Sequence, residues 1–240
     1  MARHINSSRA RWDSDYYKRL SSLYLKNTLK LFDEKHASAV KILDAGCGFG
    51  ETLHCFNETG FAVEGIDISE DCINISKQFA PASRLSIEQL SKTYPQGYFN
   101  VTVCSHTLEH VENPTIALQN LSHVTSDYLI IAVPNLARLI NFVLRRPRHV
   151  NEGHRHGWDH HHLLTFIENN SDLVLHDWVQ DLVTFPLIRN KLLYSKFASE
   201  IIEAKILSSL FPLQCNSVIA IFKKNASRSL LAPNNKGHNL

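Results

Sequence analysis

The feature that most constrains this chain is an alternation of short apolar runs with amphipathic segments between residues 40 and 133. Apolar, often β-branched runs lie at 40–44, 62–67, 101–105 and 128–133, with a weaker run near 84–87, and helical periodicity marks 51–58, 70–79 and 114–124. Strands that alternate with helices at this spacing form βαβ units, whose strands are parallel. Two later runs, 173–179 and 217–222, predict further strands around a helical stretch at 191–210. We therefore predict an α/β fold.

The chain divides into one main domain and two terminal segments. Its 240 residues suffice for one substantial core but are few for two full domains. Helical periodicity at 12–35 predicts one or two helices ahead of the first strand, and we expect residues 1–38, with Trp12, Tyr16 and Tyr17, to form a lid. The predicted domain spans 39–224, and the Asn- and Ser-rich segment 225–240 is expected to be a flexible tail.

Composition excludes several classes of partner. The net charge is +2, from 25 Lys and Arg against 23 Asp and Glu, so it predicts no nucleic-acid partner. The five cysteines show no CxxC pair or metal-ligand spacing, as expected for reduced thiols in a cytoplasmic protein. An arginine-rich apolar segment at 138–148 is the one stretch that suggests transient contact with a membrane surface, although a solvated basic face is the commoner explanation.

The most informative motif is a glycine-rich loop that follows the first predicted strand. Gly46, Gly48 and Gly50 allow a sharp turn and leave no Cβ between the loop and a ligand. A dinucleotide fingerprint would have its third glycine where this chain has Glu51, so NAD and FAD are disfavoured. Asp67 ends the second predicted strand, where a carboxylate can accept two hydrogen bonds from a ribose diol. The pattern predicts a nucleoside-binding site.

Four motifs in succession, DAGCGFG, GIDIS, CSHTLEHVENP and IIAVPN, resemble those of the class I S-adenosylmethionine methyltransferases. The resemblance covers roughly residues 40–135 and includes the ubiquinone-pathway O-methyltransferase type. It implies S-adenosylmethionine as cofactor, bound across the carboxyl ends of the first strands. It also implies a Rossmann-like, mainly parallel sheet of seven strands with helices on both faces and an antiparallel last strand.

The resemblance also implies roles for individual residues. On the methionine side of the cofactor the matching residues are Asp44, Gly46, Cys47, Gly48 and Gly50; on the ribose and adenine side they are Asp67 and Ile68; and Ser105 and His106 face the sulfonium. Ser86 stands where the family often has an adenine-side Asp, and the resemblance implies that it is the cofactor contact on that side. Asn100 stands where the family often has Asp, so the adenine side of the site departs most from the family.

Histidines supply the candidate bases. Six of the fourteen histidines lie between residues 149 and 162, in the connection where the family builds its acceptor pocket. An imidazole can take a proton from a hydroxyl or amine, so we expect the catalytic base to be His106 or one of His154 and His156. His106, Glu109 and His110 have a spacing that could converge on a metal ion, but a Glu-His pair recurs here in the family without one, and we expect no metal.

These observations predict a methyltransferase that uses S-adenosylmethionine to methylate a small-molecule, lipid-linked or glycan acceptor, on oxygen. The alternative is a catalytically silent S-adenosylmethionine-binding module that acts through a protein partner. The identity of the acceptor, the choice among oxygen, nitrogen and carbon, and the oligomeric state stay open at this point.

Overall fold

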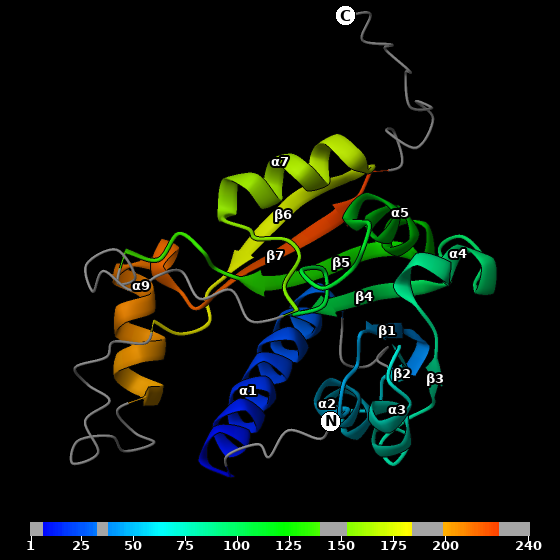
Figure 1. The fold of residues 1–240 in the computed structure, drawn as a ribbon, viewed down its shortest axis with the longest axis horizontal. Helices are drawn as coiled ribbons and strands as arrows, with labels where there is room; N and C mark the ends of the chain where they lie inside the picture. Colours follow the sequence, from blue (N-terminus) through cyan, green and yellow to red (C-terminus); the bar gives the residue numbers. More distant parts are fainter. Residues whose placement is uncertain (1–6, 33–37, 140–152, 184–198, 226–240) are drawn as a thin grey trace, which may run out of the picture.

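The computed structural model describes residues 7–32, 38–139, 153–183 and 199–225, which form one seven-stranded sheet with helices on both faces (Figure 1). The strands, in chain order, are β1 (Lys41–Ala45), β2 (Ala62–Asp67), β3 (Ala82–Arg84), β4 (Phe99–Ser105), β5 (Thr125–Pro134), β6 (Leu173–Val179) and β7 (Ser217–Lys224). Their order across the sheet is β3-β2-β1-β4-β5-β7-β6, and β7 runs antiparallel to both of its neighbours. The predicted sheet and its antiparallel last strand are confirmed.

The alternation of side chains along each strand produces two cores. On β5, Leu129 and Ile131 face one core, whereas Ile130 and Ala132 face the other. The first core is closed by the 3-10 turn η2 (Ile87–Gln89) and by α4 (Leu90–Thr93), α5 (Pro114–Val124) and α7 (His160–Asn170). The second is closed by α1 (Ser7–Leu31), α2 (Glu51–Glu58) and α3 (Glu70–Ser76), on the opposite side of the sheet in Figure 1.

Most predicted boundaries agree with the structure to within a few residues, and the differences have local causes. The helix predicted at 70–79 ends at Ser76, and the weak strand predicted at 84–87 is β3, at Ala82–Arg84, on the sheet edge beside β2. Helix α7 was not predicted, because its first turn consists of histidines and shows no apolar periodicity. The apolar positions of this helix begin only at Leu163 and Ile167, which are both buried. Asp159 caps this helix by accepting a hydrogen bond from the His162 amide.

Only part of some predicted segments falls within the described residues. Of the helical stretch predicted at 191–210, the structure describes a π-helix, η3 (Ser199–Leu207), and the short α9 (Ser208–Leu210), which the 3-10 turn η4 (Pro212–Gln214) joins to β7. The basic segment 138–148 lies outside the described residues except for its first two positions, as does the tail from 226 onward. Within the described parts of the chain, no helix is long and apolar enough to cross a membrane.

Helix α1 belongs to the core rather than lying loosely over it. Leu20 and Tyr24 are buried among side chains of β1, β4 and α2, and Ser21 shares a hydrogen bond with Thr52 of α2. The C-terminal half of α1 is thus fixed to the sheet. The role of residues 1–38 as a lid stays a prediction.

Candidate active site

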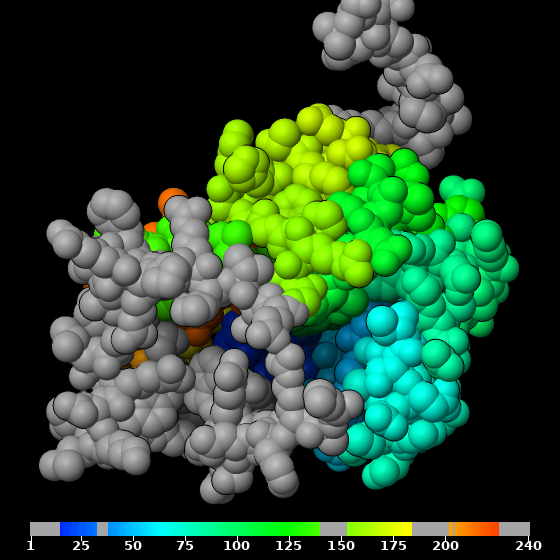
Figure 2. All heavy atoms as spheres, in the orientation of Figure 1, coloured from blue at the N-terminus to red at the C-terminus, as the bar shows by residue number. Residues whose placement is uncertain are grey.

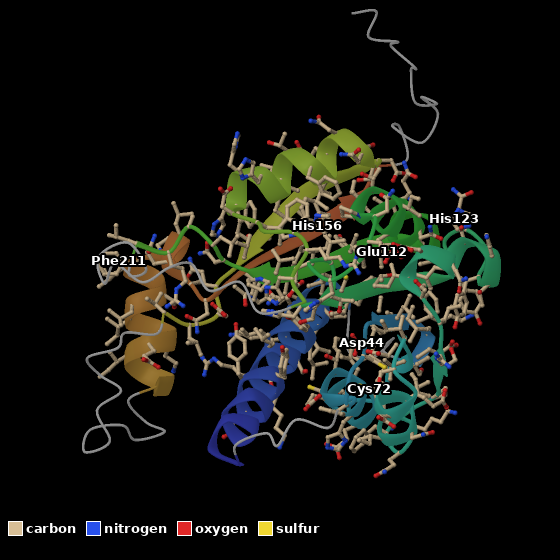
Figure 3. The ribbon with its side chains drawn as sticks, viewed as in Figure 1. Asp44, Cys72, Glu112, His123, His156 and Phe211 are labelled. Atoms are coloured by element: carbon tan, nitrogen blue, oxygen red, sulfur yellow. The ribbon has the colours of Figure 1, made fainter. Side chains whose placement is uncertain are left out.

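The loops that follow β1, β2 and β4 meet at one edge of the sheet, because parallel strands present their carboxyl ends together. Figure 2 shows α1, in blue, recessed between the cyan surface formed around α3 and the yellow-green surface ahead of α7. Asp44, near the end of β1, lies on the α2 side of the sheet, whereas His156 lies on the side covered by α5 and α7 (Figure 3). The predicted site residues therefore approach this edge from both faces.

The glycine loop has the backbone that its sequence predicts. Gly46, Gly48 and Gly50 all have positive φ, at 89°, 50° and 90°. A Cβ on Gly46 would overlap the Thr107 side chain, so the loop after β1 is in close contact with the loop after β4. Among the residues that the structure describes, and apart from its chain neighbours, none has an atom within 4 Å of a Cβ on Gly48. Gly46 is thus required by packing, whereas Gly48 borders open space.

Asp67 connects the end of β2 to this loop. One carboxylate oxygen accepts a hydrogen bond from the Gly48 amide at 3.0 Å, and the other accepts one from the Ser69 amide at 2.8 Å. Both bonds fix the carboxylate plane and leave further lone pairs on each oxygen. The next residue, Ile68, is 70% exposed, which is unusual for an isoleucine that directly follows a core strand. An oriented carboxylate beside an exposed apolar side chain suits a nucleoside, whose diol is polar and whose base is flat.

Ser86 has a structural role in its own turn. Its hydroxyl accepts a hydrogen bond from the Glu88 amide at 3.3 Å and caps the η2 turn. The cap accounts for a serine at this position without any ligand, and the proposed contact of Ser86 with adenine stays a prediction.

The loop after β4 presents His106 in an unusual backbone conformation. His106 has φ of 50°, the one positive value outside glycine in the described residues, and its amide donates to the Ala132 carbonyl of β5. Strained backbone of this kind is often found at functional sites. The ring is 13% exposed and makes edge contacts with Tyr16 and Tyr17 of α1, at centroid distances of 6.1 and 5.7 Å. Ser105, just before it, shares a hydrogen bond of 2.8 Å with buried Tyr24.

A relay of hydrogen bonds fixes the His106 ring. The Tyr16 hydroxyl donates to the Asp181 carboxylate at 2.5 Å and also lies 2.5 Å from the Ser217 hydroxyl. Since Tyr16 has one hydroxyl proton, Ser217 must donate to Tyr16. The His106 Nε2, 2.9 Å from the Ser217 hydroxyl, must then be the donor in its own bond. A neutral His106 ring therefore has its lone pair on Nδ1, which lies 3.6 Å from the Glu109 carboxylate.

Asp181 is the buried end of this relay. It is 1% exposed and also accepts from the Ser217 amide at 3.2 Å. Burial raises the pKa of Asp181, and burial likewise raises the pKa of Tyr16 well above its usual value. The Tyr16 hydroxyl therefore keeps its proton more firmly than it would in water, whereas the hydrogen bonds from Tyr16 and the Ser217 amide oppose the effect of burial on the pKa of Asp181.

The three predicted bases divide into two groups. Glu109, 1% exposed, lies close to His106 and also to His154, whose Nε2 is 4.0 Å from the carboxylate. Burial lowers the pKa of His154. His156 points elsewhere: its Nε2 lies 3.1 Å from the Val111 carbonyl and so donates to it. The structure thus brings His106 and His154 together around one carboxylate, while His156 ties its segment to the loop after β4.

Comparison with known proteins agrees with this geometry. The family described as methyltransferase domain matches residues 15–171, more than half of the chain. The chain belongs to this methyltransferase family. Relatives include the ubiquinone biosynthesis O-methyltransferases of Methylococcus capsulatus, 33% identical over 113 residues, and Idiomarina loihiensis, 32% identical over 114 residues. Each match covers 43% of this chain and 46% of the relative, so the chain matches about half the length of these curated proteins.

Solved structures share the fold of this methyltransferase at low identity. Magnesium protoporphyrin IX methyltransferase from Synechocystis, with S-adenosylhomocysteine bound, has a TM-score of 0.60 and 15% identity over 94% of this chain and 90% of that one. A methyltransferase from Archaeoglobus fulgidus has a TM-score of 0.55 and 21% identity over 89% and 98% of the two chains. Family membership confirms the predicted class and its cofactor, S-adenosylmethionine.

The described residues of the methyltransferase fit this cofactor. Asp44 is 2% exposed, and burial together with the charges of Glu51 and Asp67 raises its pKa to about 8. A cation beside Asp44 would lower this pKa and stabilise the ionised carboxylate, so the site favours a cationic ligand, and S-adenosylmethionine carries a sulfonium and an ammonium group. Cys47 is buried with its thiol 3.8 Å from the Ser76 hydroxyl, so its backbone, rather than its side chain, is the part that can contact a ligand.

Sequence reasoning missed the residues that hold His106. Ser217 and Asp181 lie more than 70 residues away from it along the chain and in elements without a motif. Tyr24 was not singled out within the helical segment predicted at 12–35, and Tyr16 was predicted only as part of a lid. A weak signal was present in Asp181, because an acid in an apolar stretch (Val179 to Val183) is seldom left without a partner.

The contacts of Asp67 give a quantitative prediction. Asp67→Ala is expected to weaken binding of S-adenosylhomocysteine to the methyltransferase by about 1.5–3 kcal/mol, because it removes charge-assisted hydrogen bonds to the ligand and to the Gly48 amide. Titration calorimetry measures the change. Asp71→Ala, which removes an exposed acid from the first turn of α3, is the matched control and should bind normally. Equal affinity of a folded Asp67→Ala and the wild type would remove Asp67 from the site.

Proposed function

We propose that this methyltransferase transfers the methyl group of S-adenosylmethionine to a hydroxyl of a small-molecule, lipid-linked or glycan acceptor. The cofactor supplies an activated methyl group, so the protein must mainly orient the acceptor and remove its proton. The observation that carries the proposal is His106, an imidazole at the carboxyl end of β4, fixed by Ser217 and in contact with the loop that includes Gly46 through its neighbour Thr107.

The relay supports a specific role for each nitrogen of His106. Because Nε2 donates to Ser217, Nδ1 is the atom that can accept the acceptor's hydroxyl proton. The imidazolium that results would lie 3.6 Å from the Glu109 carboxylate, whose charge would stabilise it. Ser217, Tyr16 and Asp181 are positioning residues, since they reach the reaction only through the His106 ring.

Two tyrosines of α1 support the exclusion of water from this point. Tyr16 and Tyr17 pack their ring edges against His106, and Tyr16 is fixed by Asp181. Aromatic rings over the base restrict the direction from which an acceptor can enter. The N-terminal segment would then act as the wall of the acceptor site, in agreement with the lid that the sequence predicts.

Methylation on oxygen has two supports. The curated relatives are named ubiquinone biosynthesis O-methyltransferases, and the proposed base is needed for a hydroxyl, which is a poor nucleophile until it loses its proton. The alternative, a silent S-adenosylmethionine-binding module that acts through a protein partner, requires no positioned base. The enclosed His106 and its relay favour the enzyme.

The test is incubation of the full chain with methyl-labelled S-adenosylmethionine and fractionated cell extract. We expect one class of fractions to gain label with the wild type. Asp67→Ala should label none at a cofactor concentration too low to occupy its weakened site. A wild-type protein that binds the cofactor in calorimetry but labels no fraction would favour the silent module.

A further inference from the structure

The role proposed for Glu109 beside His106 does not explain the two further imidazoles, of His110 and His154, around its buried carboxylate. Both carboxylate oxygens of Glu109 are buried and receive no hydrogen bond from any residue that the structure describes. The Nε2 atoms of His110 and His154 lie 3.9 and 4.0 Å from one of these oxygens. The three candidate ligand atoms of Glu109, His110 and His154 all lie within 4.8 Å of one another. A buried carboxylate without hydrogen bonds is costly unless a cation compensates it.

The hydrogen bond of His110 shows which of its nitrogens can bind a cation. Its Nδ1 lies 2.9 Å from the Gly153 carbonyl, and a carbonyl only accepts, so Nδ1 carries a proton. The neutral ring then has its lone pair on Nε2, the atom that faces Glu109. A backbone carbonyl that orients the far nitrogen of a histidine is the usual surrounding of a metal-bound imidazole.

We propose that Glu109, His110 and His154 bind one divalent transition-metal ion, with zinc the best match to two imidazoles and a carboxylate. Ligands that share a tetrahedral ion lie roughly 3.3 Å apart, so the three side chains would draw together slightly on binding. Three protein ligands leave a fourth position open. From the sequence we expected no metal at His106, Glu109 and His110, because a Glu-His pair recurs in the family without one; the fold supplies His154 in addition, 44 residues beyond His110.

The ion would join two segments that follow neighbouring strands. Glu109 and His110 belong to the loop after β4, and His154 belongs to the segment ahead of α7. The amides of Arg155 and His156 already donate to the Glu109 carbonyl, at 2.7 and 3.2 Å, so the two segments are held in register at this point. The proposal goes beyond methyl transfer and does not depend on the acceptor.

The experiment is a titration of chelator-treated full chain, without an affinity tag, with Zn²⁺ in calorimetry and with Co²⁺ in visible absorption. We expect one equivalent to bind, with the intense Co²⁺ bands of a four-coordinate site. His110→Ala should lower the affinity at least about 100-fold, because it removes a ligand from an ordered set. Its side chain is 46% exposed, so this variant is expected to fold.

The matched control is His162→Ala, which also removes one histidine but from the exposed first turn of α7. It should bind the ion as the wild type does, and Glu109→Gln should lose binding as His110→Ala does. Absence of stoichiometric binding to the wild type, or equal binding by His110→Ala and His162→Ala, would overturn the proposal. Since methyl transfer is not measured, these outcomes are independent of the proposed reaction.

Discussion

Gly48→Val is expected to abolish binding of S-adenosylhomocysteine while the α/β fold persists. Apart from the chain neighbours of Gly48, no residue in the described part of the chain has an atom within 4 Å of the position that a Cβ would take, so the new side chain would occupy the space that we assign to the ligand. Titration calorimetry and circular dichroism measure the two properties. Valine at φ of 50° is also strained, which should cost about 1–3 kcal/mol of stability.

Gly60→Val separates this strain from the loss of ligand space. Gly60 also has a positive φ and an open Cβ position, but it lies in the turn between α2 and β2, at the amino edge of the sheet. This variant should be destabilised to a similar extent and bind the ligand normally. If Gly48→Val, once folded, binds as Gly60→Val does, the glycine loop is structural and the site assignment fails.

His106→Asn is expected to lower kcat by about 100- to 10,000-fold, the usual effect of losing a general base, with little change in affinity for S-adenosylhomocysteine. Asparagine is chosen because it tolerates a positive φ and removes the imidazole. The rate is measured with the acceptor that becomes labelled in extract. The rate should fall without a matching loss of cofactor affinity, because the base acts on the acceptor and not on the cofactor.

Two further variants define the role of His106. Tyr16→Phe keeps the ring that packs on His106 but breaks the relay, so its kcat should fall by less than that of His106→Asn. His162→Ala, at an exposed helix position, should have the rate of the wild type. A His106→Asn enzyme that turns over as fast as the His162→Ala enzyme would exclude His106 as the base.

Local signals predicted the elements and the backbone around the glycine loop. A strand, a glycine loop and a helix start follow one another within a few residues, and Asp67 ends the next strand, so chain order alone brings these groups to one edge. The positive φ values at Gly46, Gly48 and Gly50 are what glycine at those positions indicates. Because the signals that begin and end α2, β2 and α5 are also local, the boundaries of these elements agree with the sequence patterns.

The acceptor side was less predictable because its contacts are between distant parts of the chain. The partners of His106 come from α1, from β7 and from the stretch just after β6, which no periodicity connects. The histidine-rich segment shows the same limit: His154 and His156 are two residues apart, yet one faces Glu109 and the other donates to the Val111 carbonyl. Spacing identified them as candidates, and only the packing of the two loops distinguishes them.

The measurement that tests the central proposal most directly is the chemical identity of the group formed. S-adenosylmethionine labelled with ¹³C in its methyl group is incubated with the wild-type chain and extract, and the labelled product is examined by NMR. We predict a methoxy carbon that is formed by the wild type and His162→Ala enzymes and strongly reduced with His106→Asn. Label on nitrogen or carbon, or a methoxy product whose rate of formation is unaffected by His106→Asn, would contradict transfer to a hydroxyl activated by His106.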